Sequence, residues 1–270
     1  MPRFFEVARQ TFLLQVRGKV FLILTVLSVL FSCLFLVIPP DASVVPGNEL
    51  FEMVAYGSAF TALLPFITLF LASQAIGGDI DDRTSVYLFT RPISRLSLLV
   101  GKWLAVILLA GVFVTIGMTS LFVVIGLGPR EWQSGAEPTT ANYLTMLLAG
   151  WLAIVGYTSV GCLFAAFFRR PMLISVLYIF VEQFASRLPP QVGIHTLTVA
   201  FPTRVFMYKN MDECWELETT LRGAMDASRE EGRKLMEVEP LTAIIKIMLF
   251  TMILAGLIYC RREYDSRPRE

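Results

Sequence analysis

The sequence has few of the residues from which soluble enzymes and secreted domains build their sites. Among 270 residues there is one histidine, His195, so one copy of the chain cannot form a site that needs two histidines. Only four cysteines occur, three inside apolar runs and Cys214 alone in a polar segment. This layout predicts neither a disulfide framework nor a metal cluster.

Charged residues are also scarce. They make up 17% of the chain, against about 25% in ordinary soluble domains, whereas hydrophobic residues make up 55%. The net charge is +1, so no excess of basic residues indicates a nucleic-acid partner. This composition is typical of a protein that lies in a lipid bilayer.

Long apolar runs dominate what is present. A helix rises about 1.5 Å per residue, so a run of about 20 apolar residues can cross the hydrocarbon core. The six predicted spans are residues 20–38, 53–76, 103–127, 143–168, 172–189 and 241–260. Apolar runs without alternation favour helices over barrel strands. We therefore expect an all-α membrane protein with six transmembrane helices, residues 1–270 forming a single transmembrane domain.

The first run could instead belong to a signal peptide. Its apolar stretch, however, exceeds the roughly 7–15 residues of a signal sequence, and no A-x-A cleavage site follows it.

Basic residues predict the orientation of the spans, because short cytoplasmic segments are rich in Lys and Arg. Lys and Arg residues lie in the N-terminal segment, in the segment 77–102, in the turn after the fourth span and in the C-terminal tail. The segment 39–52 has no basic residue. Both termini and the segment 77–102 are therefore expected in the cytoplasm. Residues 190–240 are expected to form an extracytoplasmic loop that caps the membrane surface and continues into a helical part.

Residues 1–19 are expected to form an amphipathic helix in the membrane interface. Phe5, Ala8, Phe12 and Val16 fall on one stripe of such a helix, and the charged side chains lie largely away from it. The alternative is a cytoplasmic extension of the first span.

The segment 77–102, GGDIDDRTSVYLFTRPISRLSLLVGK, is charged although it separates two apolar runs. Arg91 should break a helix because the residue before a proline disfavours helical geometry, and Pro92 suits the first turn of a following helix. We expect a short cytoplasmic helix, a kink and a lead-in to the third span. A segment tied to spans at both ends can transmit force. The alternative is an ordinary amphipathic loop helix that lies on the bilayer.

The stretch DRTSVYLFTRPISRLSLLVGK resembles the signature of ABC transporter permeases of the ABC-2 type. That signature has an acidic residue, Gly-Thr, a short apolar run, Ser/Thr-x-Pro-Ile/Val-Ser/Thr-Arg and a later Gly-Lys. The matching residues are Asp82, Thr84, Thr90, Pro92, Ser94, Arg95, Gly101 and Lys102. One departure is Arg83, which stands where the family usually has a glycine.

The resemblance also covers the entry helix, the six spans and residues 180–202. It implies the membrane-spanning permease subunit of an ATP-binding-cassette exporter in a bacterial or archaeal plasma membrane. Such subunits pair with a second permease copy or a homologue, and residues 80–91 would be a coupling helix that docks on a cytoplasmic ATP-binding subunit. The residues implied in coupling to that subunit are Asp82, Thr84, Thr90, Arg91, Pro92, Ser94 and Arg95.

A phosphate-binding loop of the form G-x-x-x-x-G-K-[ST] does not occur in the sequence. We therefore expect no cofactor in this chain, and ATP and Mg on the partner subunit that hydrolyses ATP. An alternative is a membrane-embedded enzyme, although H-E-x-x-H and G-x-S-x-G are also missing. A non-transporting channel or an assembly scaffold is a further alternative.

Glu182 is the residue of most interest within the predicted spans. A carboxylate at the centre of a bilayer costs a few kcal/mol on insertion scales, so it is expected to face protein or water. We interpret it as a pathway or gate residue, paired with Arg187 or with the other protomer. The alternative is a shallow position from which both charges reach lipid headgroups. Elsewhere, the small residues Gly161 and Ala165 favour close helix packing within the chain.

Overall fold

The computed structural model of the protein describes residues 3–37, 47–81, 94–127, 140–168, 170–185, 198–211 and 239–261. Within these residues every regular element is a helix, as predicted. The elements are α1 (Arg3–Arg17), α2 (Lys19–Val37), α3 (Gly47–Val54), the π-helix η1 (Ala55–Leu63), α4 (Leu64–Asp81), α6 (Arg95–Gly126), α7 (Thr140–Phe167), α8 (Pro171–Ala185), α9 (Ala200–Asn210) and α12 (Pro240–Arg261).

Four stretches of the described helices are long and apolar enough to cross a membrane: Phe51–Gly77, Arg95–Gly126, Thr140–Phe167 and Pro240–Arg261. A fifth crossing arises if α1 and α2, which meet at a bend of 60°, form one broken span. The apolar helix α8 has 15 residues and is shorter than these. The described residues thus provide four or five spans, and the count of six stays a prediction.

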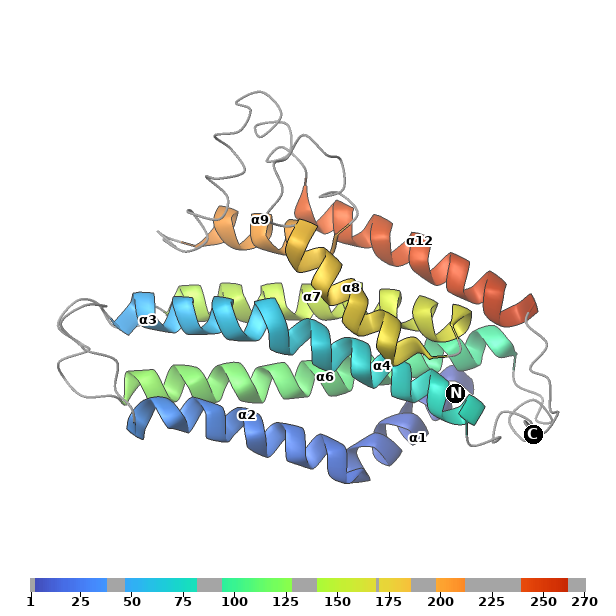
Figure 1. Ribbon diagram of the computed structural model, residues 1–270, viewed down its shortest axis with the longest axis horizontal. Coiled ribbons are helices and arrows are strands. Elements are labelled where there is room, and N and C mark those ends of the chain that lie inside the picture. The colour runs from blue at the N-terminus through green and yellow to red at the C-terminus, as the bar shows by residue number, and fades with distance from the viewer. Residues whose placement is uncertain are drawn as a thin grey trace.

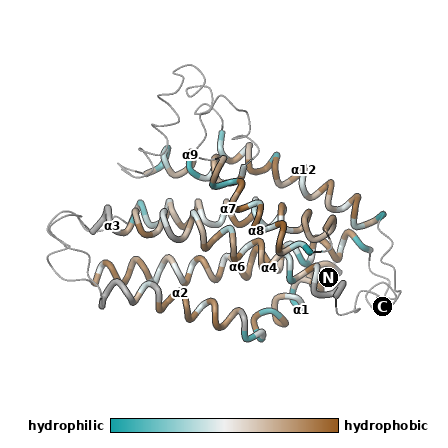
Figure 2. Tube along the Cα trace, in the orientation of Figure 1, coloured by the Kyte–Doolittle hydropathy of each residue, from teal (hydrophilic) through white to brown (hydrophobic). Residues whose placement is uncertain are grey.

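The helices pack around α6 and α7. α6 contacts α1, α2, α4 and α7, and α7 contacts α4, α9 and α12. Figure 1 shows α2 along one side of α6 and the continuous rod of α3, η1 and α4 along the other. α9 lies toward the end of the molecule that is remote from the N-terminus. Figure 2 shows that the long helices are apolar over most of their length, on outer as well as inner faces.

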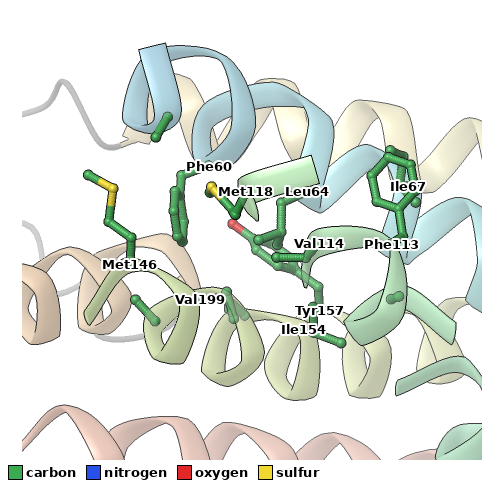
Figure 3. Close-up of a cluster of buried hydrophobic side chains, with 14 of the residues drawn as sticks. Phe60, Leu64, Ile67, Phe113, Val114, Met118, Met146, Ile154, Tyr157 and Val199 are labelled. Carbon is green, nitrogen blue, oxygen red and sulfur yellow. The ribbon is translucent and has the colours of Figure 1, made fainter. Parts of the chain in front are cut away.

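Small residues bring the long helices together. A Cβ atom on Gly161 of α7 would lie 2.6 Å from Cβ of Ala72 on α4, so only glycine allows this approach. Gly111 of α6 similarly receives the indole ring of Trp151. Such close contacts matter in lipid, where the hydrophobic effect does not drive helices together. The prediction that Gly161 packs within the chain is confirmed. Figure 3 shows Phe60 and Leu64 gathered with Ile154 and Tyr157 in the core.

α1 packs against α6, with Val7 and Ala8 buried and Val7 in contact with Gly101. Phe5 and Val16 of the predicted apolar stripe are exposed by 52% and 36%, so they are free to contact lipid. The position of this helix in the membrane interface stays a prediction.

The second predicted span contains a π-helical segment that the sequence analysis did not predict. In η1 the Thr61 hydroxyl donates to the Tyr56 carbonyl and the Leu64 amide donates to the Ala59 carbonyl, each five residues back. π-helical turns inside α-helices are rare and occur frequently at functional sites. This segment lines the cavity beside α7 and α9 that is described below.

Candidate functional site

The first turn of α6 holds the last two residues of the predicted coupling set. Ser94 caps the helix, because its hydroxyl accepts a 3.2 Å hydrogen bond from the Ser97 amide. Arg95 follows, and its Nη1 donates to the Cys260 carbonyl oxygen at 2.9 Å, near the end of α12. The guanidinium thus satisfies a carbonyl in the last turn of α12, where a positive charge is favourable.

Gly101 and Lys102 join the next turns of α6 to two further helices. The Lys102 side chain is 4% exposed, and its ammonium donates to the Ala75 carbonyl of α4 at 2.5 Å. A Cβ on Gly101 would lie 2.7 Å from the Phe4 carbonyl oxygen, so α1 crosses α6 in direct backbone contact. Within about two turns, α6 is therefore fastened to α12, α4 and α1. We call Arg95, Gly101 and Lys102 the α6 junction.

The other predicted coupling residues, Asp82, Thr84, Thr90, Arg91 and Pro92, lie outside the described residues. Their flanks are described: α4 ends at Asp81 and α6 begins at Arg95. The hydrogen bond from Lys102 to Ala75 joins these two flanking helices. The α6 junction therefore lies directly beside the segment whose role remains a prediction.

At the other candidate position, Glu182 of α8 is 1% exposed and faces protein. Its Oε2 accepts a 2.8 Å hydrogen bond from the Tyr157 hydroxyl of α7. Its Oε1 accepts from the backbone amides of Val199 and Ala200, at 2.8 and 2.9 Å. These amides begin α9, so a carboxylate from a separate helix occupies the N-terminus of α9, where negative charge is stabilised. The predicted partner Arg187 lies outside the described residues.

α9 runs beside α7 over most of the length of α9. It begins where Val199 fills the space above Gly156, and a Cβ there would lie 2.6 Å from the valine Cγ1. It ends where the Thr145 hydroxyl donates to the Asn210 carbonyl at 3.3 Å. The 12 residues from Thr145 to Tyr157 correspond to about 18 Å of helix. Residues 198–211 therefore extend along a candidate span, whereas the sequence led us to expect a segment that caps the membrane surface.

Residues that the sequence analysis did not select surround this region. Arg204 of α9 is 8% exposed, and its guanidinium carbon lies 5.7 Å from the centre of the Tyr56 ring. Gln183, next to Glu182, donates at 2.7 Å to the Thr61 carbonyl in η1. Arg204 stands in a stretch of mixed polarity, so only its charge among apolar neighbours, FPTRVFM, could have drawn attention to it.

A small, partly open cavity lies between η1, α7 and α9. It borders Arg204 and the Tyr157 ring whose hydroxyl binds Glu182. Its lining residues are Tyr56, Phe60, Thr61, Ala153, Tyr157, Ala200, Thr203, Arg204 and Met207. Within the described residues no group of three or more His, Cys, Asp or Glu side chains is placed to hold a metal ion.

A family model described as ABC-2 family transporter protein matches residues 5–254 of the sequence. Among curated proteins the search found no significant match. The matched range includes both the α6 junction and the Glu182 site.

Proposed function

Because the chain belongs to the ABC-2 transporter family, we propose that it is the permease subunit of an exporter driven by a separate ATP-binding subunit. The family match over residues 5–254 carries this proposal. As a member of the family with several apolar helices of spanning length, the protein is an integral, multi-pass membrane protein and a transport component.

The proposed coupling route begins at residues 80–91, which follow from the end of α4 and precede α6. The α6 junction supports it, because Lys102 and Arg95 fasten α6 to α4 and α12 close to that segment. A push on the segment would then move several helices together instead of bending one. A conformational change needs different contacts in two states, and the junction is where we expect those contacts to change.

The remaining parts of the proposal follow from the family resemblance. A second copy of the permease, or a homologue, completes the transport unit in the plasma membrane. With six spans, both termini and residues 80–91 would lie in the cytoplasm. Glu182 with Arg187 is proposed as a pathway or gate pair because of the cost of a charge within the membrane. ATP and Mg bind the partner subunit.

Copurification tests the proposal. The tagged permease is expressed with the ATP-binding subunit encoded beside it, and retention of that subunit is measured. We expect Asp82→Lys and Arg91→Glu to lose retention. Lys209→Glu, an exposed charge reversal on α9 at the opposite end of the molecule, should retain it. A permease that never retains an ATPase would contradict the exporter function, and unchanged retention in both reversal variants would remove the docking role.

Arg95 needs a different substitution, because its side chain also binds the Cys260 carbonyl. Arg95→Glu would break this contact as well as reverse a charge. Arg95→Gln keeps a donor while it removes the charge, so a loss of retention in Arg95→Gln would assign the charge itself to docking.

A further inference from the structure

Arg204 is a buried cation without a counter-charge at bonding distance. Its side chain is 8% exposed, and among the described residues it has no ion pair and no hydrogen bond. Its described partner is the face of the Tyr56 ring, at 5.7 Å. A ring face attracts a guanidinium but uses none of its five N–H donors. Burying a charge with unfilled donors is costly, so such an arrangement calls for an acceptor.

Glu182 is a buried acidic group beside the cavity, and both of its oxygens are already used. Both of its oxygens accept hydrogen bonds, one from Tyr157 and the other from the amides that begin α9. The carboxylate therefore compensates the positive end of α9. Among the described residues Arg204 makes no hydrogen bond or ion pair with Glu182, so this carboxylate does not use its donors.

The cavity beside Arg204 provides the space for an acceptor. It is partly open, and it has room for about one water-sized group. The hydroxyls of Thr203 and Thr61 donate to the backbone carbonyls of Val199 and Tyr56. The Tyr157 hydroxyl donates to Glu182. The guanidinium is consequently a group on the wall that can donate to an entering molecule, and it carries a positive charge.

The surroundings favour an anion over a neutral acceptor. Phe60, Ala153 and Met207 form apolar walls, and electrostatic attraction is stronger beside such walls than in water. A guanidinium presents a planar fork that matches the two oxygens of a carboxylate or phosphate. Because the enclosed space is small, only the leading oxygens of the group would enter, and the rest of the molecule would lie outside.

We propose that Arg204 and the cavity between η1, α7 and α9 bind one oxyanion group, a carboxylate or a phosphate, of the molecule that the permease transports. This assignment rests on the proposed export function, and it restricts the substrate to acidic compounds. The group comes either from an anionic lipid headgroup or from a soluble acid.

Thermal unfolding in phosphatidylcholine nanodiscs tests the site, since a ligand that binds the folded protein raises the melting temperature. The probes are inorganic phosphate, acetate and phosphatidylglycerol added to the bilayer, with sodium chloride at matched ionic strength as the reference. The variants are Arg204→Gln, Arg204→Lys and the control Lys209→Gln, an exposed cation on the same helix.

We expect at least one oxyanion probe to raise the melting temperature of the wild type and of Lys209→Gln beyond the sodium chloride reference. Affinity should fall about tenfold or more in Arg204→Gln, as the loss of a charged hydrogen bond implies. Arg204→Lys keeps the positive charge but lacks the planar pair of guanidinium donors, so it should bind the probe with intermediate affinity. If Arg204→Gln does not fold, the affinity of Arg204→Lys tests whether Arg204 binds the probe. A response to phosphate or acetate assigns a soluble acid, and a response to phosphatidylglycerol alone assigns a lipid.

Two results would overturn the proposal: equal responses in the wild type and the Arg204 variants, or no response above sodium chloride. The measurement needs only this chain, so its failure leaves the exporter function standing. Conversely, failure to copurify an ATPase leaves the binding result intact.

Discussion

The ammonium group of Lys102 on α6 donates a hydrogen bond to the carbonyl oxygen of Ala75 on α4. Both residues are buried, with exposed fractions of 4% and 6%. α4 and α6 are the helices that precede and follow residues 82–93, so this bond joins the two helices to which the proposed coupling segment is attached. A variant that lacks this bond therefore allows docking of the partner and transmission of movement to be tested separately.

Lys102→Met should therefore reduce transport severalfold while the ATP-binding subunit is still retained. Methionine keeps most of the apolar packing of the lysine stem and removes the donor. Since the substitution removes a hydrogen bond from a charged donor, stability should fall by about 1–3 kcal/mol. Transport and copurification are measured in the same preparation. Loss of retention in parallel with transport would show that Lys102 acts on docking instead.

Glu182→Ala should lower the free energy of unfolding by about 2–4 kcal/mol, because it leaves the Tyr157 hydroxyl and two backbone amides without their acceptor. Glu182→Gln keeps one acceptor oxygen and should cost less. Denaturation followed by circular dichroism in detergent measures both. The control Glu239→Ala removes an exposed carboxylate just before α12 and should cost no more than about 1 kcal/mol. A stable Glu182→Ala protein would contradict the capping role.

Gly156→Val should displace Val199 and, with it, the amides that Glu182 binds. The added Cβ would meet the Val199 side chain at 2.6 Å, and overpacking typically costs about 1–3 kcal/mol. The same variant should make the α9 region more sensitive to limited proteolysis. Gly126→Ala is the matched control, since a Cβ there has no described neighbour within 4 Å. Equal stability and equal proteolysis of the two variants would show that α7 and α9 are not packed this way.

The chain carries two natural cysteines that can test the predicted topology. Cys214 belongs to the predicted extracytoplasmic loop, and Cys260 is exposed near the end of α12. Single-cysteine variants that keep one or the other are treated in intact cells with a membrane-impermeant maleimide. We expect labelling of Cys214 without lysis and labelling of Cys260 only after lysis. The opposite pattern would invert the orientation, and labelling of both in intact cells would exclude six spans.

The all-helical class and the approximate positions of the long spans could be predicted from the sequence, because lipid excludes charge and rewards continuous apolar runs. The start of α6 was predicted less fully. A lead-in before a span from residue 103 was expected, and the structure has one continuous helix from Arg95 to Gly126. Charges at Arg95 and Lys102 suggested a boundary, yet both cations bind carbonyls of neighbouring helices, which the sequence alone does not reveal.

The candidate site was accessible to sequence reasoning only in part. Glu182 was selected because placing a carboxylate inside a membrane costs free energy, and its side chain is buried in protein. Its acceptor role for α9 depends on residues 17 and 18 positions away, and no local pattern encodes that distance. Arg204 was missed because a single arginine in a predicted loop has no marked pattern. Its burial arises from the way α9 lies along α7.

The π-helical segment η1 gives the second span a choice of hydrogen-bond register. A carbonyl in such a segment can be shared with an amide four or five residues ahead, so η1 could convert to an α-helix without losing its backbone bonds. Because a π-helix is wider and advances less per residue, that conversion would lengthen the rod and turn α3 about its axis relative to α4. Tyr56, which faces Arg204, and Thr61, which binds Gln183, would turn with it. A change of register in η1 would therefore join a rotation of Tyr56 and Thr61 to a change in the length of the rod that α3, η1 and α4 form.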